Sequence, residues 1–227
     1  MIYLKEFATQ AEYDAFVASG QMKRPNVSYI EETLSVEYKK PIQYGVFIQH
    51  IDGTLFTIEQ WKNQGYVNDL ANGVAVITDL CSFVIGGDLN YWGSWGSAKY
   101  LDGILSTSDA SVAKTDYLGR KNTEIMMANG NEKAAYACVN YQFPNGQTGY
   151  LPSVGEWYVI ADNLTSINQA LTAIARATIK NGSTDNYWTS TQSLTDAWQI
   201  TPYSKSIGVF SKNGRLANAL AVTELIM

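Results

Sequence analysis

The 227-residue sequence contains few of the residues on which most enzymes depend, since it has one histidine and two cysteines. His50 lies in the alternating stretch IQHI, where a lone histidine is usually structural. Cys81 and Cys138 stand apart in apolar contexts, which favours buried free thiols over a disulfide and argues against a zinc site or a Cys–His nucleophile. The chain carries no serine-hydrolase elbow, nucleotide-binding loop or EF-hand motif. We therefore expect no catalytic activity, no metal and no cofactor.

Charge is also scarce, at 16% of the residues, and the net charge is −5. Lysine and arginine form no run beyond pairs such as Lys39-Lys40, which argues against a nucleic-acid partner. No apolar run approaches the ~20 residues of a membrane span, so membrane insertion is not expected. The N-terminal MIYLKEFATQ lacks the apolar core of a signal peptide, which predicts synthesis in the cytoplasm without secretion by this route.

The sequence is rich in tyrosine and tryptophan, with 15 and 6 residues respectively. These side chains combine an apolar body with a polar tip, which suits recognition surfaces. Because strands also favour aromatic residues, a β-rich core is an equally good explanation of the composition alone.

Residues 1–66 are predicted to form a small α/β-hairpin appendage and a candidate assembly element. The pattern indicates a helix over 4–20, a hairpin over 25–38 with Glu31-Glu32 at its tip, and a second hairpin over 44–57 that turns at Asp52-Gly53. Thr57 and Gln60 have capping-box spacing at the start of a short helix.

Residues 67–227 are predicted to form one α+β domain. Buried strands at 73–78 and 82–85 lead into the loop GGDLNYWGSWGS at 86–97. The tryptophans of this loop either pack back on the body, which we favour, or belong to a binding face. Asp88 and Asn90 are the one modest candidate for calcium. Helices are expected in the second half of 108–128, after the Ser153–Glu156 capping box and over 165–177, with strands from there to the C-terminus.

Several motifs in this domain resemble one known family. They are TDYLGRKNTEIM at 115–126, GYLPSVGEW at 149–157, NYWTSTQ at 186–192, DAW at 196–198 and ALAV at 219–222. Together, over roughly residues 70–227, they are similar to the bacterial and phage branch of the C-type lectin-like fold, the group related to formylglycine-generating-enzyme domains. The similarity is strongest to the variable proteins of diversity-generating retroelements and to phage tail adhesins. The enzymes of this group use paired cysteines near the C-terminus, and this chain has none after Cys138.

The resemblance implies a C-type lectin-like domain that binds a ligand without chemical change. It predicts a phage or prophage tail-associated adhesin, located on a virion or cell surface, whose partner is a bacterial cell-surface receptor of protein or glycan. Such adhesins are often multimeric, which implies a homotrimer and binding strengthened by avidity. The alternative is a structural or assembly component of a phage tail or surface appendage without a receptor site of its own.

The binding face is expected on the C-terminal strands. Alternation places Gln199, Thr201 and Tyr203 on one side of a strand, and Pro202 indicates an edge strand or the end of that strand. A solvated sheet face without a partner is the alternative. The predicted ligand-binding residues are Asn186, Ser193, Leu194, Thr195, Asp196, Gln199, Thr201, Tyr203, Ser206, Phe210, Lys212 and Arg215, of which Tyr203, Phe210, Gln199 and Thr201 are the expected main contacts.

Overall fold

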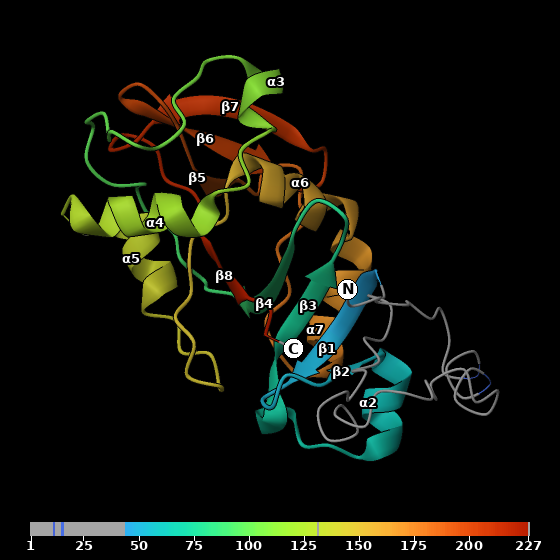
Figure 1. The fold of residues 1–227 in the computed structure, drawn as a ribbon. Coiled ribbons are helices and arrows are strands. Elements are labelled where there is room, and N and C mark those ends of the chain that lie inside the picture. The colour runs from blue at the N-terminus through green and yellow to red at the C-terminus, as the bar shows by residue number, and fades with distance from the viewer. Residues whose placement is uncertain (1–10, 12–14, 16–43, 131, 227) are drawn as a thin grey trace, which may run out of the picture. The chain divides into compact units, whose positions relative to one another are not determined.

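The structure is a computed structural model that describes residues 11, 15, 44–130 and 132–226 (Figure 1). The chain divides into two units, Met1–Gln43 and Tyr44–Met227. The predicted helix over 4–20 and hairpin over 25–38 lie outside the described residues, apart from Ala11 and Ala15, which are helical. The larger unit mixes helices with antiparallel sheets, so the α+β class is confirmed.

The larger sheet has five antiparallel strands in the order β2-β1-β3-β4-β8. The strands are β1 (Gly45–His50), β2 (Leu55–Phe56), β3 (Ala71–Ile77), β4 (Ser82–Asp88) and β8 (Leu220–Glu224). The hairpin predicted over 44–57 is confirmed: Gly53 takes φ 94° in its turn, and the Thr54 N–H donates to Asp52 Oδ1 over 2.9 Å.

This hairpin belongs to the main sheet, which corrects the domain boundary predicted at residue 66. β1 pairs with β3 from Gly45 to His50, and α2 (Ile58–Gln64) follows, with its predicted capping box between Thr57 and Gln60. Residues 44–66 therefore form part of the larger unit. The apolar stretch GVFI pairs with β3 and is half-buried up to Ile48, which is fully buried. The sequence pattern alone shows a hairpin and not its partner strand.

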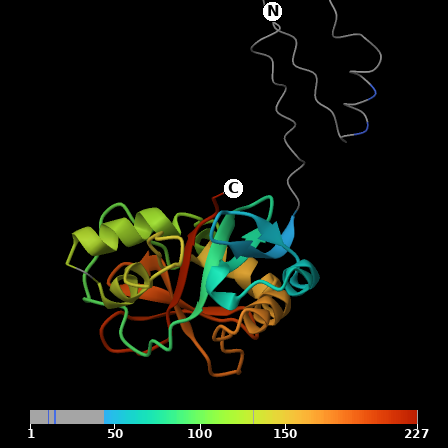
Figure 2. The ribbon, with the colours of Figure 1, turned by 90° about the horizontal axis from the view of Figure 1, so that it is seen from below.

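Helices cover both faces of the five-stranded sheet (Figure 2). Alternation along β3 sends Val74 and Val76 into one core, with α6 (Val154–Asp162) and α7 (Leu164–Ala173), and Ala75 into the other. That second core includes residues of α4 (Gly119–Ala128) and α5 (Lys133–Val139). The short helices are η1 (Asn68–Leu70) and α3 (Ala110–Ala113). Among the described residues, none of the helices has the length and apolarity needed to span a bilayer.

The second sheet has three antiparallel strands in the order β5-β6-β7. They are β5 (Tyr187–Ser193), β6 (Asp196–Thr201) and β7 (Ser206–Ser211), and Pro202 directly follows β6, as predicted for the end of a strand. β6 is buried on both faces, since Trp198 and Ile200 are as inaccessible as Ala197 and Gln199. This sheet therefore has no face left fully open to solvent along its central strand.

Candidate functional site

The motifs that carry the family resemblance meet in a buried polar network at the N-terminus of α6. Asp116 Oδ2 accepts hydrogen bonds from Asn122 Nδ2 over 2.9 Å and from Thr191 Oγ1 over 2.7 Å. Its Oδ1 accepts from the Leu118 N–H over 3.0 Å, and Thr191 Oγ1 accepts from the Val154 N–H over 3.1 Å. Segments 116–122, 153–156 and 189–191, far apart in the sequence, are thus joined directly.

The network includes the predicted capping box of α6 and is closely packed. Glu156 accepts from the Ser153 N–H over 2.8 Å and from the Tyr150 hydroxyl over 3.2 Å. Burial raises the pKa of the Glu156 carboxyl to about 7, although these hydrogen bonds act in the opposite direction. A Cβ atom on Gly155 would lie 2.5 Å from the Asp116 carbonyl oxygen, so only glycine fits there. The network stabilises the fold and is closed to a ligand.

A different region offers an accessible surface. Residues 89–105, the β5–β6 turn at 194–195 and residues 211–216 meet at one end of the three-stranded sheet, and we call them the loop surface. Gly93 and Ala217 exchange backbone hydrogen bonds of 3.1 and 3.0 Å, and the Gly96 N–H donates to the Lys212 carbonyl over 3.2 Å. The Leu194 N–H donates to Ser106 Oγ over 2.9 Å. The three segments are therefore held together mainly through backbone atoms.

The Lys212 amine lies beneath the loop surface and joins its segments. Its Nζ donates to the carbonyl oxygens of Lys99 and Leu194 over 2.7 and 3.3 Å, and to Gln192 Oε1 over 2.9 Å. It also lies 4.5 Å from the centre of the Trp95 ring. Burial lowers the pKa of Lys212 to about 8, while the negative charges of Glu132 and Asp196 oppose this shift.

Four large apolar side chains are exposed on the loop surface. The exposed fractions are 59% for Trp92, 50% for Tyr100, 69% for Leu194 and 45% for Leu216. Trp95, by contrast, is fully buried and donates its Nε1–H to the Thr189 carbonyl over 2.8 Å. The expected packing against the body is confirmed for Trp95, which anchors the loop, whereas Trp92 is exposed to solvent.

Leu194 is also strained. It has φ 52°, a left-handed conformation that costs roughly 1–2 kcal/mol for a residue with a Cβ atom. Glycine or asparagine normally occupies such a position in a two-residue hairpin turn. Leu194, at the tip of the β5–β6 turn, is thus strained and exposed, and it belongs to none of the three hydrophobic clusters.

The twelve predicted binding residues do not form one cluster. Leu194, Thr195 and Arg215 are exposed on the loop surface, and Asp196 is half-buried beside it. Tyr203 and Ser206 are exposed at the opposite end of the β6–β7 hairpin, roughly 17 Å away along six residues of strand. The half-buried Asn186 and Thr201 bond to each other there, over 2.7 Å.

Several of these residues are covered, which corrects the expectation of an open sheet face. Gln199, Lys212 and Ser193 are buried, and Phe210 is half-buried with the Arg215 guanidinium 5.1 Å from its ring centre. The loop after β4 packs on this side of the sheet, so alternation correctly gives the side chains one face but not its exposure. Tyr100 and Leu216 are not among the predicted binding residues, and for Trp92 a place in a binding face was only the alternative to packing on the body. A large aromatic residue in a glycine-rich loop was the available signal.

The calcium candidate is occupied by hydrogen-bond donors. Asp88 accepts from the Tyr187 hydroxyl and, over 2.6 Å, from the Asn90 N–H, and it lies 3.8 Å from Lys180 Nζ. These donors use the oxygen atoms that calcium would require. Among the described residues, no group of three or more His, Cys, Asp or Glu side chains is placed to hold a metal ion.

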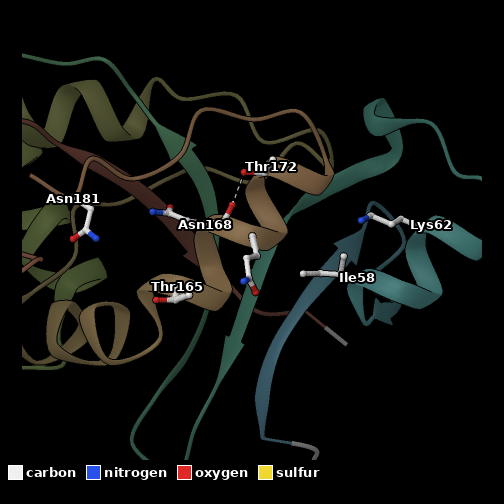
Figure 3. A pocket seen from close by; sticks show the side chains of 7 residues that line it. Ile58, Lys62, Thr165, Asn168, Thr172 and Asn181 are labelled. Atoms are coloured by element: carbon white, nitrogen blue, oxygen red, sulfur yellow. Dashed lines mark hydrogen bonds between the residues drawn. The ribbon is translucent and has the colours of Figure 1, made fainter.

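A hollow of about 600 Å³ lies between α2 and α7 (Figure 3). Asn168 uses its amide to bond the backbone of Ile179 over 2.9 and 3.0 Å, so this side chain holds the following loop in place. Lys62 is the one charged group in the lining. The lining residues are Ile58, Lys62, Thr165, Asn168, Gln169, Thr172 and Asn181, which include no acid–base pair.

In comparisons with known proteins, no family model, curated protein or solved structure matches this chain. The assignment of a site therefore depends on the geometry alone. Of the regions above, the loop surface is the one that combines exposed apolar side chains with a rigid support.

Proposed function

We propose that this protein is a non-enzymatic receptor-binding protein, a phage or prophage tail-associated adhesin that presents the loop surface on a C-type lectin-like scaffold. Its partner is a receptor on a bacterial cell surface. The observation that carries the proposal is the way the loop surface is supported: the buried Lys212 amine bonds the backbone carbonyls of Lys99 and Leu194.

Because Lys212 bonds backbone carbonyls, the support of the loop surface does not depend on the side chains that the loop surface exposes. A carbonyl oxygen is present whatever the side chain, so residues 99 and 194 can change without loss of the bond to Lys212. The exposed side chains of Trp92, Tyr100 and Leu194 likewise contribute little to the core. Such an arrangement suits a variable binding face, in which the frame stays constant while the contact residues differ.

The buried network supports the choice of scaffold. The residues that gave the family resemblance, among them Asp116, Ser153 and Thr191, contact one another through short hydrogen bonds. This is what we expect of a family whose motifs preserve a frame rather than a catalytic centre. The strand β8 also pairs with β4, so that the resembling motif at 219–222 forms one edge of the five-stranded sheet.

The chemistry of the loop surface fits a macromolecular receptor. Tryptophan and tyrosine are the side chains most often found at the energetic centre of protein interfaces, because they bury much area with few rotatable bonds. Trp92 and Tyr100 are at least half exposed, so they are available for such contacts. Lys99 and Arg215 supply charged groups at the margin of the same surface.

The test is cell binding by the fluorescently labelled full chain, measured by flow cytometry on a panel of bacterial strains. We expect the double variant Trp92→Ala/Tyr100→Ala to bind at least roughly tenfold more weakly, as loss of interface aromatics usually does. Tyr203→Ala is the matched control, because it removes an equally exposed aromatic residue at the far end of the hairpin. Protease and periodate treatment of the cells distinguishes a protein receptor from a glycan.

Two outcomes would contradict the proposal. If Tyr203→Ala abolishes binding and the double variant does not, the binding site lies at the other end of the three-stranded sheet. If neither change affects binding but the double variant fails to enter particles, the protein is an assembly component without its own receptor site.

A further inference from the structure

β7 forms an open edge of the three-stranded sheet. Its inner side pairs with β6 along all six residues, from Ser206 to Ser211. Among the described residues, no backbone group between Ile207 and Phe210 bonds to anything on the other side. An exposed edge presents unpaired N–H and C=O groups that match those of another extended strand.

The other sheet edges in the described part of the chain are short or covered. β2 has two residues. Beyond β8, Tyr150 exchanges backbone hydrogen bonds of 2.7 and 3.1 Å with Val222. Beyond β5, the N–H groups of Trp188 and Ser190 donate to the carbonyls of Asn218 and Pro152 over 2.9 and 2.8 Å. Among the described residues, an open edge over the four residues Ile207–Phe210 is thus a particular property of β7.

β7 also lacks the usual protection of an edge strand. Its sequence, SIGVFS, contains no charged residue and no proline, the two features that most often prevent edge-to-edge pairing. Ile207 and Val209 are half-buried, so part of their apolar surface remains to be covered. On the same side, Ala113 of α3 packs with this pair, and the neighbouring Val112 is 41% exposed.

We propose that the β7 edge is a self-association surface at which two copies of this chain pair antiparallel into a continuous six-stranded sheet. The unpaired N–H and C=O groups of β7 match those of an extended strand, so a strand is the element that fits this edge. A second copy supplies the same uncharged strand, and a two-fold axis satisfies both edges at once. Pairing closes at two copies, because no free β7 edge remains.

Side-chain alternation restricts the register. Alternation requires the two-fold axis to pass through a residue, and Gly208 or Val209, at the centre of β7, gives the longest pairing. Val209 then faces either Ile207 or Val209 of the second copy, so apolar side chains meet across the axis. A lysine at both positions would instead bring like charges together in either register. The inference is independent of the proposed receptor, since it concerns a surface at the side of the sheet rather than the loop surface.

The test is sedimentation velocity on the full chain over a wide concentration range. We expect a reversible monomer–dimer equilibrium for the wild type. The variant Ile207→Lys/Val209→Lys should weaken dimerisation by at least roughly tenfold, since like charges would lie opposite each other. The matched control Ile207→Thr/Val209→Thr keeps β-branched neutral side chains and should stay within roughly threefold of the wild type.

Hydrogen exchange provides a second measurement that does not depend on the stability of any variant. The β7 amides that point away from β6 should gain protection as the wild-type concentration rises. The proposal is overturned if the wild type stays monomeric at the highest concentration or if the lysine variant dimerises like the wild type. It is also overturned if those amides are fully protected at the lowest concentration, because the edge is then paired within one chain.

Discussion

The buried side chains of Asp116 and Lys212 both lack an ion-pair partner among the described residues. They differ in the groups that form hydrogen bonds with them. Asp116 accepts from two side chains and one N–H on regular elements or at their ends. Lys212 donates to two backbone carbonyls in loops and turns and to one side-chain amide. Their partners indicate their roles.

The difference shows how one domain can combine a fixed frame with a changeable surface. The partners of Asp116 are side chains of defined type, so the sequence around it must stay as it is. The partners of Lys212 are largely backbone atoms, so the loops that it supports are free to change their side chains. The Asp116 network depends on specific side chains and stabilises the packing of helices and strands. The Lys212 amine bonds mainly backbone carbonyls and stabilises the backbone conformation of the loops.

The largest expected effect follows from removing the acid. Asp116→Ala leaves the Thr191 hydroxyl and the Leu118 N–H without their acceptor in a buried place, and Asn122 Nδ2 keeps only Ser190 Oγ. We expect a loss of about 3–5 kcal/mol in the free energy of unfolding, measured by urea denaturation. Asp116→Asn keeps one acceptor oxygen and should lose less. An alanine variant as stable as the wild type would show that the network does not hold the frame.

Removing the base should have a smaller effect on global stability at neutral pH. Lys212→Met leaves the carbonyls of Lys99 and Leu194 without this donor, while Gln192 Oε1 keeps the Leu101 N–H. Because the change also removes a buried charge, we expect a loss of about 1–2 kcal/mol at pH 7. Limited proteolysis should show faster cleavage within residues 97–101, because the loop loses its anchor. If the Asp116 and Lys212 variants lost equal stability, the claim that Asp116 stabilises the whole fold and Lys212 mainly the loop surface would be wrong.

The difference in stability between the wild type and Lys212→Met should depend on pH, and the direction follows from the pKa of Lys212. Burial lowers the pKa of Lys212 from 10.5 in the unfolded chain to about 8. Below pH 8 both states carry the proton and the folded protein bears the full cost of the buried charge. Between pH 8 and 10.5 the unfolded state binds more protons, so stability rises with pH, by about 3 kcal/mol in total. The stability of wild type relative to Lys212→Met should therefore increase over this range, in denaturant titrations at fixed pH values.

The smallest expected effect concerns the strained tip of the loop surface. Leu194→Asn should raise the free energy of unfolding by about 0.5–1 kcal/mol, because asparagine tolerates a positive φ better than leucine. Lys205→Asn is the matched control, since Lys205 has φ 56° in the β6–β7 turn. Both changes should stabilise the protein, but only the change at 194 should weaken cell binding. Equal binding by the two variants would mean that the leucine is not a contact.

Much of the fold follows from local patterns in the sequence. The Asp52-Gly53 turn and the two capping boxes are confirmed, because each depends on neighbours within a few residues. The strand that ends at Pro202 is confirmed for the same reason. The boundary at residue 66 is wrong, since the partner of β1 is β3, and local alternation does not identify a partner strand.

The candidate site was predicted only in part, and for a physical reason. Alternation on β6 put Gln199 and Thr201 on one face, but whether that face is open depends on a loop that begins about a hundred residues earlier. Lys212 is charged and therefore looks like a surface residue in any sequence. Its burial depends on acceptors from residues 99, 192 and 194, which come together only in three dimensions.

The sequence by itself determined many of the elements of this protein, because caps, turns and apolar periodicity act over a few residues; the helix α5 is among those that it did not indicate. It also marked the motifs that hold the frame. Only the tertiary structure decided which side chains meet solvent. Exposure is a property of everything packed around a residue, so Trp92 and Trp95, three positions apart in one loop, lie on opposite sides of the surface.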